Sequence, residues 1–188
     1  GGIELQVDNW DIDAIYSGTQ KCLSCVPGLS PVSFSERAAE EIRQRKTKVQ
    51  SWFLDLNLVM GYWGSDAKRS YHHTAPVNSL YALHESLLIL QEEGLQNAWN
   101  RHALNHEALA AGLESLGLKF VVDKEYRLPQ LNAVSFPDSV DDVAVRMALL
   151  NDYNLEIGSG LGVLAGSVWR IGLMGYASNK KNVLLCIS

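Results

Sequence analysis

Several features that would place the chain in another class of protein are missing from its 188 residues. There are 16 Lys and Arg residues against 21 Asp and Glu residues, and the net charge of −5 offers no basic surface for nucleic acid. No apolar run approaches the roughly 20 residues that cross a bilayer. The start also lacks the charged and then apolar stretch of a signal segment. We therefore expect a soluble protein that binds neither nucleic acid nor membrane.

Cysteine is also scarce, with three residues, Cys22, Cys25 and Cys186. Cys22 and Cys25 have the spacing of a redox motif, but Val26-Pro-Gly28 follows where such a motif would begin a helix. No second Cys pair or Cys/His pair completes a zinc site. We expect buried free thiols in a reducing compartment and no metal.

What the chain does contain is typical of a globular protein, with 47% hydrophobic and 20% charged residues. Alternating apolar and polar residues predict a short strand at 12–16, and a stretch of hydroxyl, amide and glycine residues then leads to Lys21. A lysine at the end of a buried strand is costly unless its charge is lost or used. One use is an imine with an aldehyde, and the alternative is a surface lysine in a loop.

Hydrophobic periodicity and capping residues outline the other elements. Strands are predicted at 3–7, 29–34, 118–122, 132–136, 155–157 and 168–174. Helices are predicted at 36–45, 77–91, 95–116 and 139–152. Ser35 and Ser139 are the expected N-caps, with Asp142 at the third position of a capping box, and Gly117 ends the third helix.

The two longest predicted helices carry apolar residues at helical spacing. In the first they are Leu80, Leu83, Leu87 and Leu90, and in the second Leu95, Trp99, Leu109, Leu113 and Leu116. We expect these residues to face inward. The break between the helices places a domain boundary at about Glu93.

Arg170 lies on an otherwise apolar predicted strand. A buried arginine needs a partner, because its charge cannot be removed by deprotonation. The partner is either a structural Asp or Glu, or the carboxylate of a substrate, which a guanidinium binds with two parallel hydrogen bonds.

Five blocks of sequence carry a resemblance to a known family. They are Tyr16-Ser-Gly-Thr-Gln-Lys-Cys-Leu23, Arg45-Lys-Thr-Lys48, Tyr62-Trp-Gly64, Tyr71-His-His-Thr-Ala-Pro-Val77 and Val168-Trp-Arg-Ile-Gly-Leu-Met-Gly175. In this order they resemble the class V, fold-type I pyridoxal-phosphate enzymes. Within these they are most similar to the alanine–glyoxylate and serine–pyruvate aminotransferases. The resemblance extends over nearly the whole chain.

The resemblance implies roles for five residues. Lys21 is implied to hold pyridoxal 5'-phosphate as a Schiff base and to move the substrate proton, and Arg170 to bind the substrate carboxylate. Gln20 matches a residue at the cofactor phosphate. Tyr71 and Thr74 match residues that reach the phosphate in the other subunit, which implies a homodimer. His72 and His73 are then structural.

The resemblance also implies an organisation. Residues 1–93 would be the C-terminal part of a large α/β cofactor domain with a mostly parallel sheet, and residues 94–188 a small α+β domain whose last helix is incomplete. The chain then looks like a C-terminal fragment that begins just before the cofactor lysine. The acid for the ring nitrogen and the aromatic residue that stacks on the ring would precede Gly1, so the chain alone should be inactive.

The implied reaction is transamination of alanine or serine with glyoxylate or pyruvate. The alternatives are 3-hydroxykynurenine transaminase, 2-aminoethylphosphonate transaminase, or a structural or dimer-forming remnant without catalysis. The expected compartment is the peroxisome or mitochondrion in a eukaryote and the cytoplasm in a bacterium.

Overall fold

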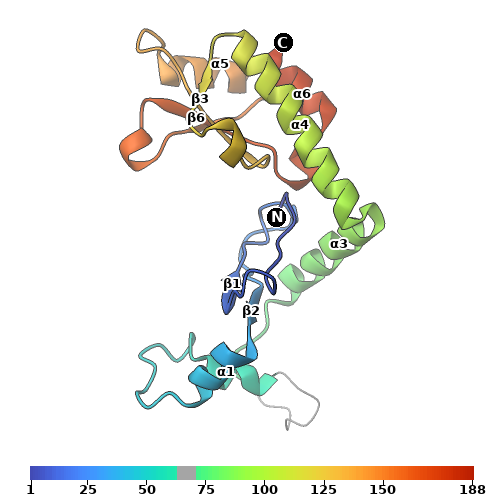
Figure 1. Ribbon diagram of the computed structural model, residues 1–188, viewed down its shortest axis with the longest axis vertical. Helices are drawn as coiled ribbons and strands as arrows, with labels where there is room; N and C mark the ends of the chain where they lie inside the picture. Colours follow the sequence, from blue (N-terminus) through green and yellow to red (C-terminus); the bar gives the residue numbers. More distant parts are fainter. Residues whose placement is uncertain (63–70) are drawn as a thin grey trace. The chain divides into compact units, whose positions relative to one another are not determined.

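The described part of the chain divides into two units. The computed structural model describes residues 1–62 and 71–188 (Figure 1). The first unit comprises Gly1–Leu5, Gln20–Cys25 and His84–Ser188, and the second comprises Gln6–Thr19 and Val26–Leu83. The division falls inside helix α3 (Val77–Glu93). The domain boundary at about Glu93 was proposed for the domains of a longer protein and stays a prediction. Trp63 and Gly64 of the third sequence block lie outside the described residues.

The first unit contains a four-stranded antiparallel sheet with the order β3-β4-β6-β5. Its strands are β3 (Lys119–Phe120), β4 (Leu131–Ser135), β5 (Gly158–Ser159) and β6 (Val168–Gly172). The strands predicted at 118–122 and 168–174 are therefore confirmed in shorter form, and the strand predicted at 132–136 is confirmed one residue earlier. Every strand pair in the described residues is antiparallel, so the parallel strands implied by the resemblance are not among them.

The strand predicted at 155–157 is wrong, because the strand begins at Gly158. The preceding residues end helix α5 (Asp142–Tyr153) instead. Asn154 adopts a left-handed backbone with φ 53°, and the N–H of Leu155 donates to the carbonyl of Leu149 at 3.0 Å. A helix end of this kind uses the backbone groups that a strand would need.

Three helices pack on one face of this sheet. They are α4 (Leu95–Ser115), α5 and α6 (Lys180–Ile187), and α4 lies beside α6 (Figure 1). The core they share with the sheet consists of Leu109, Leu113, Val134, Ile157, Trp169, Ile171, Leu173 and Val183. Since side chains alternate along a strand, Trp169 and Ile171 point to the helices and Arg170 points to the opposite face.

Helix α4 forms where the sequence predicts it but buries a different face. Leu95 and Leu116 are 54% and 64% exposed, so the expectation that they face inward is wrong. The buried residues are Ala98, His102, Asn105, Leu109, Ala110 and Leu113. Two of these are polar, and each has a hydrogen-bond partner more than 70 positions away, which periodicity of apolar residues cannot reveal.

The N-cap of α5 also differs from the prediction. Asp141, rather than Ser139, accepts the N–H of Ala144 at 3.0 Å. Asp142 is the first residue of the helix, where it pairs with Arg146 and accepts the indole N–H of Trp169. A carboxylate in the first turn interacts favourably with the helix dipole.

The second unit contains a two-stranded antiparallel sheet of β1 (Ala14–Tyr16) and β2 (Val32–Phe34). Its helices are α1 (Glu36–Arg43), α2 (Leu56–Val59) and the 3-10 turn η1 (Met60–Tyr62). Ser35 caps α1 as predicted, accepting the N–H of Ala38. The strand predicted at 3–7 is wrong, because the carbonyls of Gln6 and Val7 close a turn with the N–H groups of Trp10 and Ile12.

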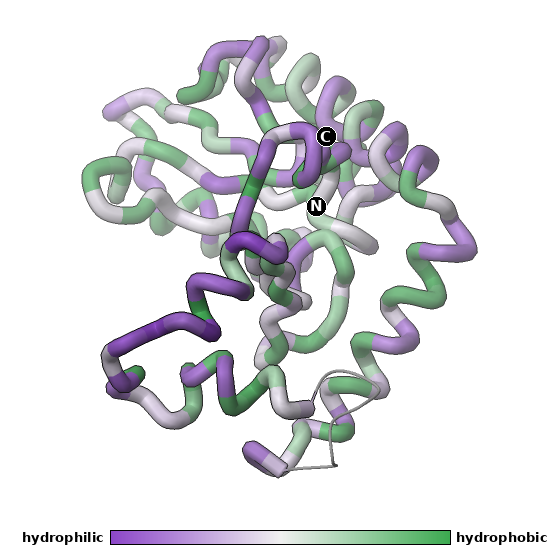
Figure 2. Tube along the Cα trace, turned by 60° about the horizontal axis from the view of Figure 1, so that its bottom comes forward, coloured by the Kyte–Doolittle hydropathy of each residue, from purple (hydrophilic) through white to green (hydrophobic). Residues whose placement is uncertain are grey.

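Helix α3 forms over the predicted residues, but none of its residues is buried. Leu80 and Leu87 of the expected inward stripe are 44% and 48% exposed. Hydrophobic residues recur along the described trace in both units (Figure 2). The remaining short 3-10 turns are η2 (Lys124–Tyr126), η3 (Gly162–Leu164) and η4 (Gly175–Ala177). No helix of the described residues is long and apolar enough to cross a membrane.

Candidate active site

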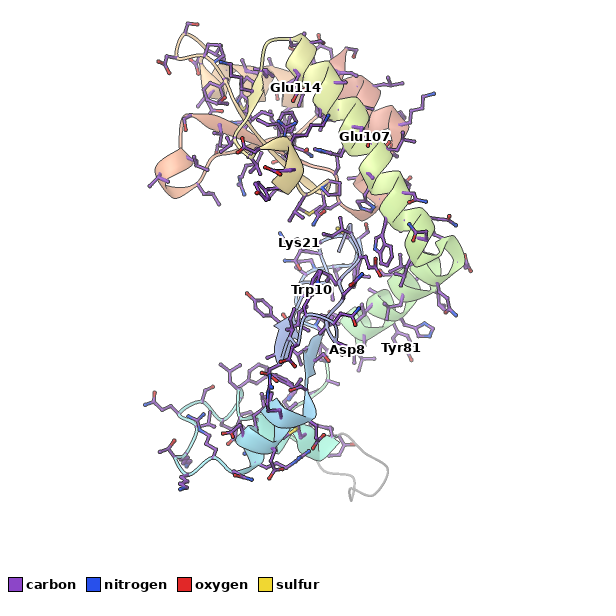
Figure 3. The ribbon with its side chains drawn as sticks, in the orientation of Figure 1. Asp8, Trp10, Lys21, Tyr81, Glu107 and Glu114 are labelled. Carbon is purple, nitrogen blue, oxygen red and sulfur yellow. The ribbon has the colours of Figure 1, made fainter. Side chains whose placement is uncertain are left out.

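Lys21 lies in a short loop, Gln20–Cys25, which we call the lysine loop (Figure 3). Thr19 just before the loop is fully buried, and its hydroxyl donates to the carbonyl of Val26, just after the loop, at 2.7 Å. This hydrogen bond holds the two ends of the loop together. The Thr19 hydroxyl, part of the polar stretch that precedes the lysine, therefore closes the loop, while the side chains of Gln20 and Lys21 are exposed.

The backbone of the lysine loop forms a turn. The N–H of Ser24 donates to the carbonyl of Lys21 at 2.9 Å, and Ser24 has a left-handed backbone with φ 55°. The hydroxyl of Ser24 accepts the N–H of Tyr176 at 2.7 Å, across 152 positions of sequence. Tyr176 belongs to residues Gly175–Ser178, which we call the Gly175 turn. The lysine loop is thus attached to the Gly175 turn within the first unit.

Arg101 of α4 holds the Gly175 turn from the other side. Its Nη1 donates to the carbonyls of Gly175 and Ser178, both at 2.7 Å. Its Nε and Nη2 bind the two carboxylate oxygens of Glu93 at 2.5 and 2.8 Å. The Arg101 guanidinium keeps the pKa of Glu93 below its usual value, and the hydrogen bonds that Arg101 donates to Glu93 raise the pKa of Arg101. The guanidinium therefore stays charged and well oriented.

His102, the next residue of α4, contacts the same turn. Its ring is 2% exposed, with Nδ1 2.6 Å from the carbonyl oxygen of Ala98. Since a carbonyl only accepts, Nδ1 carries the proton and Nε2 accepts the N–H of Gly175 at 3.0 Å. Burial lowers the pKa of His102 by disfavouring the charged form. A neutral imidazole is what these two hydrogen bonds require.

Arg170 is half-buried on β6, on the face of the sheet opposite the helices. In register with it are Ala133 of β4 and Gly158 of β5, which have little or no side chain. A Cβ at Gly158 would lie 3.3 Å from Nη2 of Arg170, so glycine leaves room for the guanidinium. The Nε of Arg170 donates to the carbonyl of Ser159 at 2.6 Å.

The guanidinium of Arg170 has no carboxylate partner among the described residues. Five other arginines in the same residues form ion pairs with Asp or Glu, namely Arg37, Arg43, Arg101, Arg127 and Arg146. Among the described residues Arg170 forms one side-chain hydrogen bond, through Nε, and its two terminal nitrogens have no acceptor there. The sequence left two possible partners for Arg170, a structural Asp or Glu and the carboxylate of a substrate. The first of these is not found among the described residues. A guanidinium with both terminal nitrogens open suits a bidentate anion.

The other two candidate residues, Tyr71 and Thr74, lie in the second unit, and both are exposed. Their loop is held by Tyr62, whose hydroxyl accepts the N–H groups of His72 and His73 at 2.5 and 2.9 Å and donates to the carbonyl of His73 at 2.7 Å. A role for Tyr62 as the anchor of this loop was not predicted from the sequence.

The paired histidines are placed by aromatic contacts. The ring of His72 stacks on Trp52 with centroids 4.1 Å apart, and its Nε2 lies 3.0 Å from the Trp52 carbonyl. The Nδ1 atoms of His72 and His73 are 2.8 Å apart. Within the described ranges, no group of three or more His, Cys, Asp or Glu residues is arranged to hold a metal.

All three cysteines are free in the structure. Burial raises the pKa of the Cys22 thiol and of the Cys186 thiol, and Cys25 is 8% exposed. Since the thiolate is the reactive form, these shifts make both thiols poorer nucleophiles. The lysine loop therefore has one exposed amine, that of Lys21, followed directly by the Cys22 thiol, which burial makes a poor nucleophile.

Comparison with known proteins gives consistent matches over the whole chain. The sequence pattern of the family Aminotransferase class-V matches residues 1–183. The chain is 38% identical over 206 residues to (S)-ureidoglycine–glyoxylate transaminase of Bacillus subtilis, covering 100% of the chain and 49% of that protein. It is 43% identical over 185 residues to alanine–glyoxylate aminotransferase of Callithrix jacchus, covering 97% and 45%.

The fold has matches among solved structures as well. The crystal structure of alanine–glyoxylate aminotransferase from Nostoc sp. superimposes with a TM-score of 0.94 at 52% identity, over 100% of this chain and 49% of that one. The α/β arrangement described above is therefore that of fold-type I aminotransferases. The chain spans about half the length of the curated relatives it matches.

Proposed function

Since the chain belongs to the Aminotransferase class-V family, we propose that it forms part of a pyridoxal-phosphate aminotransferase that passes the amino group of alanine or serine to glyoxylate or pyruvate. One observation carries the proposal. The first unit contains an exposed lysine in a loop that Ser24 attaches to the Gly175 turn and, on the open face of its sheet, an arginine without a carboxylate partner in the described residues.

The residues present fit the cofactor of this family. Pyridoxal phosphate supplies an aldehyde that links to an amine and a ring that withdraws electrons from the substrate α-carbon. The exposed amine of Lys21 would hold it, and the exposed amide of Gln20 next to it would donate to the phosphate. The amine of Lys21 would also act as the base that accepts the proton from the α-carbon of the substrate and passes it on to the cofactor.

Arg170 would orient the amino acid by binding its carboxylate. Both terminal nitrogens lack an acceptor within the described part of the chain, and the neighbouring Gly158 leaves space beside them. A bidentate pair of this kind fixes the substrate in orientation as well as in place. The keto acid that replaces the amino acid carries the same carboxylate, so one arginine would serve both halves of the reaction.

The names of the relatives support glyoxylate as the acceptor. Alanine–glyoxylate aminotransferase and (S)-ureidoglycine–glyoxylate transaminase differ in donor and share the acceptor. We therefore propose glyoxylate as the first choice and pyruvate as the second. A screen of amino donors would distinguish the alternatives, 3-hydroxykynurenine transaminase and 2-aminoethylphosphonate transaminase. A protein that turns over no donor would instead be a structural or dimer-forming remnant without catalysis.

The phosphate would receive further contacts from the second unit of another copy. Tyr71 and Thr74 are exposed on a loop that Tyr62 holds, and we propose that they reach the cofactor phosphate in a homodimer. We also propose that residues 1–93 and 94–188 belong to the large and small domains of a longer enzyme. Its compartment would be the peroxisome or mitochondrion in a eukaryote and the cytoplasm in a bacterium.

The test is an assay of the whole protein and of residues 1–188 alone with pyridoxal phosphate, alanine and glyoxylate. The whole protein should form pyruvate. The isolated chain should form almost none, because no residue in it matches the acid for the ring nitrogen, and charge-assisted bonds contribute roughly 1.5–3 kcal/mol each. A whole protein without turnover for any donor would contradict the proposal. Full turnover by the isolated chain would contradict our account of the site.

A further inference from the structure

We propose that Ser24 and Gly175 are positioning residues for Lys21, because they fix the lysine loop on the Gly175 turn, which follows the strand that carries Arg170. The inference rests on the proposed function, since it concerns the lysine and the arginine of that site. Neither residue belongs to the five site residues identified above. Their contacts join segments that are far apart in the sequence and lie in the first unit.

The first step concerns the backbone of Lys21. Its carbonyl accepts the N–H of Ser24, and the hydroxyl of Ser24 accepts the N–H of Tyr176. Ser24 has a left-handed backbone, which is uncommon for residues other than glycine. Two hydrogen bonds therefore run in series from Lys21 to the Gly175 turn, and Ser24 takes part in both, in the first through its backbone N–H and in the second through its hydroxyl.

The second step concerns the close approach of the two backbones. Gly175 has φ 55°, and a Cβ built there would overlap Oγ of Ser24 and lie 2.7 Å from the carbonyl oxygen of Cys22. No side chain fits at that position unless the lysine loop moves away. Glycine is thus required by the contact with the loop as well as by its own backbone conformation.

The third step is that the Gly175 turn is itself rigidly held. Its N–H and carbonyl groups are bound by His102 and Arg101, and Arg101 is oriented by Glu93. Ser178 at the end of the turn is fully buried, and its hydroxyl accepts from Asn105. A turn that is bound by three side chains, one of them oriented by Glu93, can hold the loop that contacts it in a fixed position.

The fourth step links the loop to Arg170. Only two residues, Leu173 and Met174, separate β6 from Gly175. Leu173 is 3% exposed in the core, and its N–H donates to the carbonyl of Gln130 at 3.0 Å. The strand that contains Arg170 is thus joined by a short, fixed segment to the turn that binds the lysine loop. A shift of the loop would change the position of Lys21 relative to Arg170.

The experiment uses the whole protein with four substitutions. Ser24→Ala removes the hydroxyl, and Ser24→Gly removes it while also accepting the left-handed backbone. Gly175→Ala forces the loop away. Gly117→Ala is the matched control, because Gly117 also has a left-handed backbone, with φ 83°, but a Cβ there would meet nothing within 4 Å.

Four quantities are measured. The first is the hydrogen exchange of the Tyr176 amide without cofactor, and the second is the affinity for pyridoxal phosphate, from the absorbance of its link to Lys21. The other two are kcat and KM for alanine. Loss of one hydrogen bond should speed exchange at Tyr176 and weaken cofactor binding about fivefold in both Ser24 variants. The Gly175 variant should bind cofactor at least about tenfold more weakly. Gly117→Ala should stay within twofold of the wild type. In the Ser24 variants kcat should fall while KM for alanine changes little, because Arg170 is untouched.

The outcomes separate this inference from the proposed function. If the wild type links the cofactor to Lys21 but the Ser24 and Gly175 variants bind it as the control does, the positioning role is overturned and the function stands. If the wild type forms no link at Lys21, the proposed function fails, and this inference fails with it. If Gly175→Ala does not fold, the two Ser24 variants decide.

Discussion

The two units of the molecule differ most in what they bury. The buried hydrophobic residues of the described part all belong to the first unit: Cys25, Ala98, Leu109, Ala110, Leu113, Val134, Ile157, Val168, Trp169, Ile171, Leu173 and Val183. In the second unit Trp52, Phe53 and Leu54 are 57%, 57% and 68% exposed. The first unit has a core of its own, and the described part of the second unit exposes most of its aromatic residues.

This difference bears on how the candidate residues act. Lys21 and Arg170 lie in the unit that has a core, where fixed backbone contacts can hold them in place. Tyr71 and Thr74 lie in the unit whose aromatic residues are exposed, and a large exposed apolar surface is typical of a contact with other protein. The contrast agrees with the proposal that Lys21 and Arg170 of the first unit act on the substrate while Tyr71 and Thr74 of the second unit contact the cofactor of another copy.

The largest effect should come from the core of the first unit. Leu109→Ala should lower the free energy of unfolding by about 2–5 kcal/mol, because Leu109 is fully buried and its truncation leaves a cavity. Leu58→Ala in the second unit, where Leu58 is 45% exposed, should cost about 0.5 kcal/mol or less. Denaturant unfolding of both variants checks the comparison, and equal losses would show that the units do not differ in this way.

The second effect concerns the arginines of the two units. Arg170→Ala should raise the KM for alanine by about 100-fold, since two charge-assisted hydrogen bonds to the carboxylate would be lost. Arg45 in the second unit is a matched control, because its Nε also donates to a backbone carbonyl, that of Thr47 at 3.0 Å. Arg45→Ala should leave the KM unchanged. Steady-state kinetics decide, and an unchanged KM in the Arg170 variant would remove its assigned role.

A smaller effect is expected in the loop that contains Tyr71 and Thr74. Tyr62→Phe removes the hydroxyl that binds two N–H groups and one carbonyl, which should cost about 1 kcal/mol and weaken cofactor affinity about fivefold. Tyr81 (Figure 3) is 73% exposed, and its hydroxyl has no recorded bond in the described residues, so Tyr81→Phe is the control. Hydrogen exchange at His72 and His73 should rise in the Tyr62 variant alone. No rise there would mean that the loop is held by other contacts.

The smallest effect should be a dependence of stability on pH through His102. Burial lowers the pKa of His102 in the folded state below the value of about 6.5 in the unfolded state. Its contribution to stability is therefore fully present above about pH 6.5 and is lost as pH falls through the lowered pKa of the folded state. In thermal unfolding between pH 5 and 8, His102→Gln should flatten the decline at acidic pH. An unchanged slope would assign the decline to other groups.

Local signals in the sequence predicted much of the fold. Ser35 and Gly117 mark helix ends correctly, because a cap depends on residues within one turn. Helix α3 was also predicted, but burial of its apolar stripe was not confirmed, since burial depends on what packs against a helix. The buried His102 and Asn105 were missed because their partners, Gly175 and Ser178, lie in a turn 73 positions later.

In the candidate site, too, the sequence did not predict contacts between residues that are far apart in the chain. Lys21 and Arg170 were identified from short motifs that resemble a known family, and the five site residues stay predictions. The contacts of Ser24 with Tyr176 and of Thr19 with Val26 were not predicted, because no local pattern records which distant backbone group a hydroxyl will meet. The sequence therefore identified the candidate reactive and binding residues, and the structure identified residues that fix the loop around Lys21.

The most direct test of the central claim locates the cofactor attachment in the chain. The whole protein is incubated with pyridoxal phosphate, reduced with borohydride and digested, and the modified peptide is identified by mass spectrometry. Our account predicts one modified residue, Lys21 in the first unit, and no modification there in a Lys21→Arg variant. Attachment at another lysine, or no attachment in a folded wild-type protein, would contradict it.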